Sequence, residues 1–136
     1  MKRSILRDCV NFAKSKFGPT HPSWNFKSIH FSSIVQNNKI LGHGVNRPAN
    51  VIPVYYGYTN MFIHSEIDVW RRVRGILEDG EWEIVNIRLT KEEDGRLAYS
   101  APCETCLNFL ASNGCSKIWF STGDKKRQFA YVIVGG

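Results

Sequence analysis

Apolar and polar positions along the chain follow the helical period in some segments and the strand period in others, which predicts that helices and strands alternate. Between Ser4 and Lys16 the apolar residues recur at helical spacing, so a first helix is expected there, with Ser4 as its N-cap. A second helix is expected over residues 63–77, which carry apolar groups along one face. Alternating or apolar runs predict strands at 29–35, 40–45, 82–89, 117–121 and 129–134, and a third helix is expected at 103–112.

Two segments lack either period and are predicted to be loops. Residues 20–27 form the shorter one, and residues 46–61 form a long loop with two prolines, a glycine and three tyrosines. Long loops in compact domains tend to be functional, so the second loop is expected to contribute to a functional site. Its aromatic side chains either stack on a bound ligand or pack within the loop; they are Tyr55, Tyr56 and Tyr58, with Phe62 just beyond.

The order of these elements predicts an α/β fold, a three-layer α/β/α sandwich around one mixed sheet of about five strands. The last two strands are joined by about seven residues, whereas a parallel crossover needs a dozen or more. They are therefore expected to be antiparallel. No internal repeat is visible, and 136 residues suit a single domain over 1–136 with a core of its own.

Composition narrows the class of protein. Hydrophobic residues make up 43% and charged residues 22%, as in ordinary globular domains, and no apolar run is long enough for a membrane span. The first residues lack a secretory segment, so a cytoplasmic protein without a membrane partner is expected. The net charge of +6 and the pI near 9.3 favour anionic partners such as nucleotides or nucleic acid, although such a surplus also serves solubility.

His64, Cys103 and Cys106 are the candidate metal ligands. One histidine and two cysteines suit Zn²⁺ and leave a fourth tetrahedral position for water. Cysteines at a helix N-terminus are favoured as thiolates, and two that lie three residues apart share one helix face. Glu66, two residues after the histidine, is placed to move the protons of that water. These residues predict a hydrolytic zinc enzyme, with Cys9 and Cys115 left as buried thiols.

The segments His64-Ser65-Glu66 and Pro102-Cys103-Glu104-Thr105-Cys106 match the His-x-Glu and Pro-Cys-x-x-Cys signature of zinc-dependent nucleobase deaminases. From about residue 29 to 122 the chain resembles the cytidine deaminase-like superfamily. The resemblance implies that zinc-bound hydroxide attacks C4 of cytosine or C6 of adenine, with Glu66 as the proton shuttle. It also implies a homo-oligomer, because small-molecule deaminases of this fold are often dimers or tetramers.

The same resemblance suggests residues that bind substrate. Asn46 stands where many members have an asparagine for the sugar hydroxyl, and the backbone at Ala101 and Cys103 is a candidate for holding the amine and the water. Neighbouring positions complete the predicted set: His43, Phe62, Ser65 and Pro102. Ser65 replaces the alanine that is more usual between the histidine and the glutamate. Two groups of basic residues are either solvated or bind phosphate. They are Arg71, Arg72 and Arg74 on the second helix, and residues 125–127 in the last turn.

Three functions are compatible with these residues. The small size and short final hairpin favour deamination of a cytosine-type base in a free nucleoside or nucleotide. The second function is the same chemistry on cytosine or adenine within RNA, such as transfer RNA, or single-stranded DNA. It is favoured by the positive net charge, the aromatic loop and the Asn-Arg-Pro segment at 46–48. The third alternative is a non-catalytic zinc module. Glu66 argues against it, because a structural zinc site closes the fourth position and needs no proton shuttle.

Overall fold

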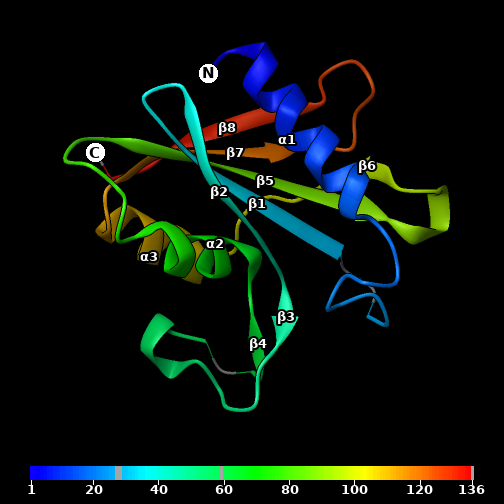
Figure 1. Ribbon diagram of the computed structural model, residues 1–136, viewed down its shortest axis with the longest axis horizontal. Helices are drawn as coiled ribbons and strands as arrows, with labels where there is room; N and C mark the ends of the chain where they lie inside the picture. Colours follow the sequence, from blue (N-terminus) through cyan, green and yellow to red (C-terminus); the bar gives the residue numbers. More distant parts are fainter. Residues whose placement is uncertain (27–28, 59, 136) are drawn as a thin grey trace.

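The computed structural model describes residues 1–26, 29–58 and 60–135. One six-stranded mixed sheet forms its centre, in the order β2-β1-β5-β7-β8, with β6 paired to β5. Helix α1 (Arg3–Lys16) covers one face, and α2 (Ser65–Val73) and α3 (Glu104–Ser112) cover the other (Figure 1). The predicted three-layer sandwich is therefore confirmed. The strands are β1 (Ile29–Gln36), β2 (Lys39–Val45), β5 (Trp82–Thr90), β6 (Arg96–Ala98), β7 (Cys115–Ser121) and β8 (Phe129–Ile133).

The pairing of the strands agrees with the expected topology. Strands β5 and β7 are parallel, and α3 lies in the connection between them. Strand β8 runs antiparallel to β7, with Lys117 opposite Ile133 and Ser121 opposite Phe129. The prediction drawn from the short final turn is thus confirmed. No helix within the described ranges is long and apolar enough to cross a lipid bilayer.

Alternation along the central strands divides the interior into two cores. Phe31 and Val35 of β1 pack toward α1, whereas Ile34 belongs to the core under α2 and α3. Side chains at 30, 32 and 34 therefore share the face that α2 and α3 cover. Cys9 and Cys115 are buried, one in each core, as predicted. Burial raises the pKa of the Cys9 thiol to about 11 and that of Cys115 to about 12.

Several element boundaries differ from the predicted ones. Helix α1 begins at Arg3, so Ser4 lies inside it, and the N-cap is Lys2 without a side-chain hydrogen bond. The expectation of a Ser4 cap was wrong. Helix α2 begins two residues later than predicted, because His64 has extended backbone angles and serves as the N-cap. It ends at Val73, short of the predicted residue 77.

The segment predicted as one long loop has regular structure at its base. Strand β3 (Arg47–Pro48) pairs antiparallel with β4 (Phe62–Ile63), and the 3-10 turn η1 (Val54–Tyr56) lies between them. Residues 47–63, called the arm here, project from the body of the molecule (Figure 1). Residue 59 of this loop and residue 27 of the shorter one lie outside the described residues.

Buried Asp68 of α2 ties the base of the arm to the body. Its carboxylate accepts a hydrogen bond of 2.9 Å from the backbone N–H of Val45 and forms ion pairs with Arg47 at 3.2 Å and Arg72 at 3.3 Å. Arg72 is therefore engaged within the protein. The guanidinium of Arg74 lies 5.4 Å from the centre of the Trp70 ring, a cation–π contact.

Gly44 allows α2 to lie directly on β2. A Cβ atom there would come within 2.5 Å of the Val69 nitrogen and 2.9 Å of the Ser65 carbonyl oxygen, both backbone atoms. We expect Gly44→Ala to lower the free energy of unfolding by about 1–3 kcal/mol or more, because backbone must move. Urea denaturation measures this change.

Gly75→Ala is the matched control, because its Cβ would meet no atom within 4 Å. Equal stability of the Gly44→Ala and Gly75→Ala proteins would contradict the close approach of α2 and β2.

Candidate active site

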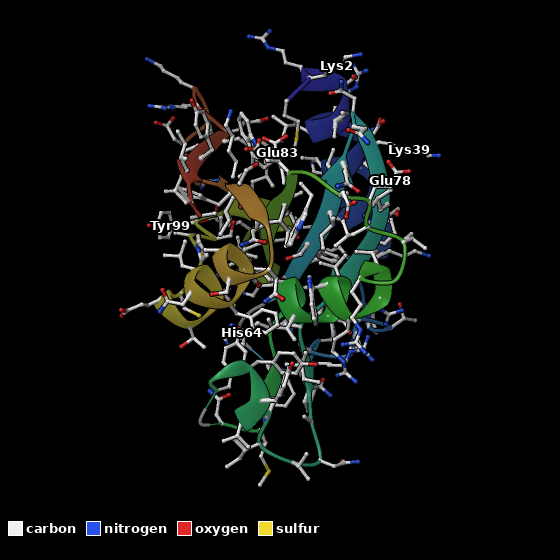
Figure 2. All side chains as sticks on the ribbon, turned by 90° about the vertical axis from the view of Figure 1, so that its left-hand side faces the viewer. Lys2, Lys39, His64, Glu78, Glu83 and Tyr99 are labelled. Atoms are coloured by element: carbon white, nitrogen blue, oxygen red, sulfur yellow. The ribbon has the colours of Figure 1, made fainter. Side chains whose placement is uncertain are left out.

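Three candidate ligands meet where two helices begin. His64 is the N-cap of α2, Cys103 is the N-cap of α3, and Cys106 is buried in the first turn of α3. His64 Nδ1 lies 3.5 Å from the sulfur of Cys106 and 3.7 Å from that of Cys103. Figure 2 shows His64 at the level where the arm joins the body, beside α3. The structure thus brings together all three residues that the sequence spacing selected.

The distances within this cluster fit a tetrahedral metal site. Zinc bound at about 2.3 Å from sulfur and 2.0–2.1 Å from nitrogen places these two atoms about 3.6 Å apart. The two nitrogen–sulfur distances bracket that value, and all three ligand atoms lie within 4.8 Å of one another. Three protein ligands leave a fourth position for water or substrate, which is the arrangement of catalytic zinc sites.

The cluster is electrostatically prepared for a cation. A hydrogen bond with Cys106, with help from His64, lowers the pKa of Cys103 to about 4 despite partial burial. The neighbouring Cys103 sulfur and burial raise the pKa of Cys106. Burial acts to lower the pKa of His64, but the Cys103 hydrogen bond and the charge of Glu66 raise it overall. A divalent cation between the two sulfurs would favour both thiolates, so metal binding should release protons.

Tyr58 is part of this cluster, although the sequence reasoning did not place it there. Its hydroxyl is hydrogen-bonded to the Cys106 sulfur, and its ring centre lies 4.3 Å from that of His64. Burial, followed by the charge of Cys106, raises the pKa of Tyr58, so the hydroxyl stays protonated and can donate to a Cys106 thiolate. Tyr56 packs on Trp70 and Phe109. These two tyrosines therefore serve packing around the His64, Cys103 and Cys106 side chains rather than stacking in the cavity.

Glu66 is buried and belongs to a hydrogen-bonded chain that crosses the interface between sheet and helix. Ser65 Oγ donates to Glu66 Oε1 at 3.1 Å and lies 2.7 Å from Ser32 Oγ. Ser32 Oγ in turn lies 2.8 Å from the side-chain oxygen position of Asn86. Ser65 Oγ donates to the Glu66 carboxylate, and Ser32 Oγ donates to the Oδ1 atom of Asn86. The chain therefore fixes the orientation of the carboxylate.

A cavity of about 380 Å³ lies beside the cluster. Asn46, Phe62, Ser65 and Ala101 line it, and all four were predicted to be near the substrate. The Oδ1 atom of Asn46 accepts a hydrogen bond of 2.9 Å from the backbone N–H of His30, which holds the amide at the cavity wall. Residues from five segments of the chain contribute to the lining: Phe26, His30, Asn46, Asn60, Phe62, His64, Ser65, Glu66, Ser100, Ala101 and Cys103.

His43 and Pro102 do not line this cavity. The His43 ring stacks on Phe12 of α1 at 3.7 Å and its Nδ1 is 2.7 Å from Ser33 Oγ, on the opposite face of the sheet. The alternation of β2 explains this, because neighbouring Gly44 faces α2 and His43 must face α1. Pro102 precedes the N-cap of α3 and so does not occupy the first helical turn, as had been expected.

Four of the cavity residues had no assigned role in the sequence: Phe26, His30, Asn60 and Ser100. His30 faces the cavity because it shares the β1 face of Ser32, a parity that the alternation could have indicated. Burial, with Arg88 as the next cause, lowers the pKa of His30 to about 4, so its ring is neutral at neutral pH. Phe26 meets Phe62 edge to face at 5.0 Å. Because Phe26 is brought there only by tertiary structure, no local pattern marked it.

No protein-family model matches the chain, and no curated protein sequence matches it. Among solved structures, cytidine deaminase from Burkholderia pseudomallei is similar over 99% of this chain and 94% of its own, with 16% identity and a TM-score of 0.58. The dCMP deaminase of cyanophage S-TIM5, in apo form, matches over 90% and 86%, with 19% identity and a TM-score of 0.54. The chain has the cytidine deaminase-like fold.

Cytidine deaminase from Mycobacterium leprae supports the same assignment, with 12% identity over 93% of this chain and a TM-score of 0.57. These matches span nearly the whole chain, beyond the segment of 29–122 that carries the sequence resemblance. The expected superfamily resemblance is therefore confirmed at the level of the cytidine deaminase-like fold. The activity of this chain has to be argued from its own residues.

Metal binding tests the cluster directly. We expect one Zn²⁺ per chain by atomic absorption and a melting temperature that rises on zinc addition and falls with a chelator, because binding energy appears as stability. Cys103→Ala should lose the metal and the temperature shift.

Cys9→Ala, which removes a buried thiol on the other face of the sheet, is the control and should keep one zinc per chain. Full zinc occupancy in Cys103→Ala would exclude this ligand set.

Proposed function

We propose that the protein is a zinc-dependent hydrolytic deaminase that converts a cytosine-type base to uracil in a free nucleoside or nucleotide. The observation that carries the proposal is the buried carboxylate of Glu66 in the wall of the cavity that also contains His64 and Cys103. A structural zinc site would have no use for a cavity and an acid–base group at its open side. The volume of about 380 Å³ lies in the range of small-molecule sites.

Zinc held by His64, Cys103 and Cys106 would lower the pKa of a bound water to about 7. Glu66 accepts a proton from the attacking water and delivers it to the ring nitrogen next to the amine-bearing carbon. A second proton transfer lets ammonia leave. Water and cytosine are consumed, and uracil and ammonia are produced. No change of oxidation state is involved.

The remaining cavity residues support binding and orientation of a nucleoside. Asn46 lines the cavity with its amide held by the His30 backbone, and by resemblance to the superfamily it would bind a sugar hydroxyl. The Phe26 and Phe62 rings give an apolar wall for a base. Ser100 and Ala101, which precede the cysteines, bring backbone groups to the same cavity, where one could hold the departing amine.

The alternative substrate is a cytosine or adenine within RNA or single-stranded DNA. The net charge of +6 and the exposed arm residues favour it, since Tyr55 is 80% exposed and base stacking uses such rings. The antiparallel β7–β8 hairpin favours a free nucleoside or nucleotide instead, because it resembles the branch of the superfamily that acts on free nucleosides. The exposed apolar side chains of the arm, Val51, Val54, Tyr55 and Met61, also support assembly into a homo-oligomer.

Glu66→Gln tests the mechanism. The substituted protein should bind zinc and fold like the parent, but ammonia release from cytidine, deoxycytidine or their monophosphates should fall by a factor of about 10² or more, because an amide moves no proton.

Glu81→Gln, an exposed position away from the cavity, should retain full turnover. The mechanism would be refuted by an active Glu66→Gln protein. Absence of turnover in the parent on every base, free or polymeric, would remove the proposed function.

Ser65→Ala tests whether Ser65 positions Glu66. Removal of the hydroxyl that donates to Glu66 Oε1 should lower kcat about tenfold or more with little change in KM, since a hydrogen bond to a charged group is worth about 1.5–3 kcal/mol. Ser65→Thr, which keeps the hydroxyl, should restore kcat. A Ser65→Ala protein with the kcat of the parent would show that Ser65 serves packing alone.

A further inference from the structure

A second cavity opens beside the first. Its volume is about 270 Å³, and Phe26 lines both cavities. It lies at the end of β5, where the 3-10 turn η2 (Lys91–Glu93) begins. The lining residues are mostly polar or charged: Asn25, Phe26, Arg88, Thr90, Lys91 and Glu92. Neither the proposed mechanism nor the predicted substrate set uses this cavity.

Arg88 places a positive charge between the two cavities. It is the cross-strand partner of His30 in the antiparallel pair of β1 and β5, and His30 lines the first cavity. Directly opposed residues of an antiparallel pair point to the same face, with Cβ atoms about 4.5–5.5 Å apart. On its other side Arg88 is opposite Ala98 of β6, which leads to Ser100 and Ala101 of the first cavity.

The guanidinium of Arg88 lacks an anionic partner among the described residues. Arg47, Arg72 and Arg96 each form an ion pair with a carboxylate, but no ion pair involves Arg88 in that part of the chain. The Nε atom of Arg88 is buried and has no hydrogen-bond partner there either. A half-buried cation with an unsatisfied donor is costly, and a bound anion relieves that cost.

The other charged groups of the second cavity leave Arg88 as its available cation. The Lys91 ammonium donates to the backbone oxygen of Trp24 and lies 4.6 Å from the centre of the Trp24 ring. His30 is neutral at neutral pH, because burial lowers its pKa to about 4. Glu92 is the single carboxylate among the lining residues, and its side chain is exposed to solvent, where its repulsion is screened.

We infer that Arg88 binds a phosphate group carried by the sugar of the substrate, in the cavity next to the deamination site. A guanidinium matches phosphate with two parallel hydrogen bonds, and Asn25 and Thr90 supply further polar groups. The inference rests on the proposed function and deepens it: the substrate is a nucleotide in preference to a nucleoside. The phosphate comes either from a monophosphate or from a polynucleotide backbone, and the experiment distinguishes these two sources.

The test compares kcat/KM of the zinc-loaded protein for deoxycytidine, dCMP and a short single-stranded oligonucleotide with one cytosine. The variants are Arg88→Gln, Arg88→Lys and the control Arg7→Gln, an exposed arginine of α1 on the other face of the sheet. Loss of a charged hydrogen bond corresponds to a factor of about 10–150. We expect Arg88→Gln to lower the ratio of kcat/KM for dCMP over deoxycytidine by such a factor, and Arg88→Lys to recover part of it.

An effect confined to the oligonucleotide would support the subsite and identify its ligand as a backbone phosphodiester. An unchanged ratio on every phosphorylated substrate, or an equal loss for deoxycytidine and dCMP, would overturn it. Melting temperature and zinc content of each variant show that the comparison is made on folded protein.

Binding separates this inference from the proposed function. Calorimetric titration of zinc-loaded Glu66→Gln with dCMP and deoxycytidine, with and without Arg88→Gln, needs no turnover. Tighter binding of dCMP that depends on Arg88, together with no turnover by the parent protein on any substrate, would support the phosphate site and exclude the proposed activity. Turnover without any dependence on Arg88 would remove the phosphate site alone.

Discussion

The meeting of two helix N-termini at one side of the sheet is the constraint on which the rest of the site depends. Helix α2 brings His64 at its cap, and α3 brings Cys103 and Cys106 in its cap and first turn. Their position depends on the parallel pair of β5 and β7, with α3 in the connection, and on Gly44, which lets α2 lie on β2. A metal ion bound by these residues would join both helices. Metal binding would then contribute to the stability of the fold.

Polar residues in the sheet serve this site through the alternation of strand side chains. Ser32 and Asn86, on neighbouring strands, carry the hydrogen-bonded chain that ends on Glu66. His30 and Arg88 are cross-strand partners further along the same two strands, next to the substrate cavity and the second cavity. One face of β1 and β5 thus changes from apolar under the helices to polar at the cavities. This change places the polar side chains that support Glu66 and line the cavities on rigid strands, whereas Glu66 itself lies on α2.

The arm contributes to the site in a different way. Its base is fixed by the pairing of β3 with β4 and by Asp68, whereas the side chains beyond are largely exposed. Tyr58 of the arm contacts buried Cys106, and Phe62 lines the cavity. The sequence showed the proline and aromatic content of this segment, but aromatic residues suit both packing and stacking. The contacts with Cys106, Trp70 and Phe109 decide that Tyr58 and Tyr56 pack.

The sequence alone predicted the layer architecture, the direction of the last strand and the cluster of His64, Cys103 and Cys106 near Glu66. Each of these follows from local information: periodicity, the length of one turn, or spacing within a motif. Tertiary structure alone decided that His43 faces α1 and that Phe26 and Arg88 line the cavities. The reason is that strand register and helix placement determine which distant residues meet, and a single sequence does not contain these pairings in any local pattern.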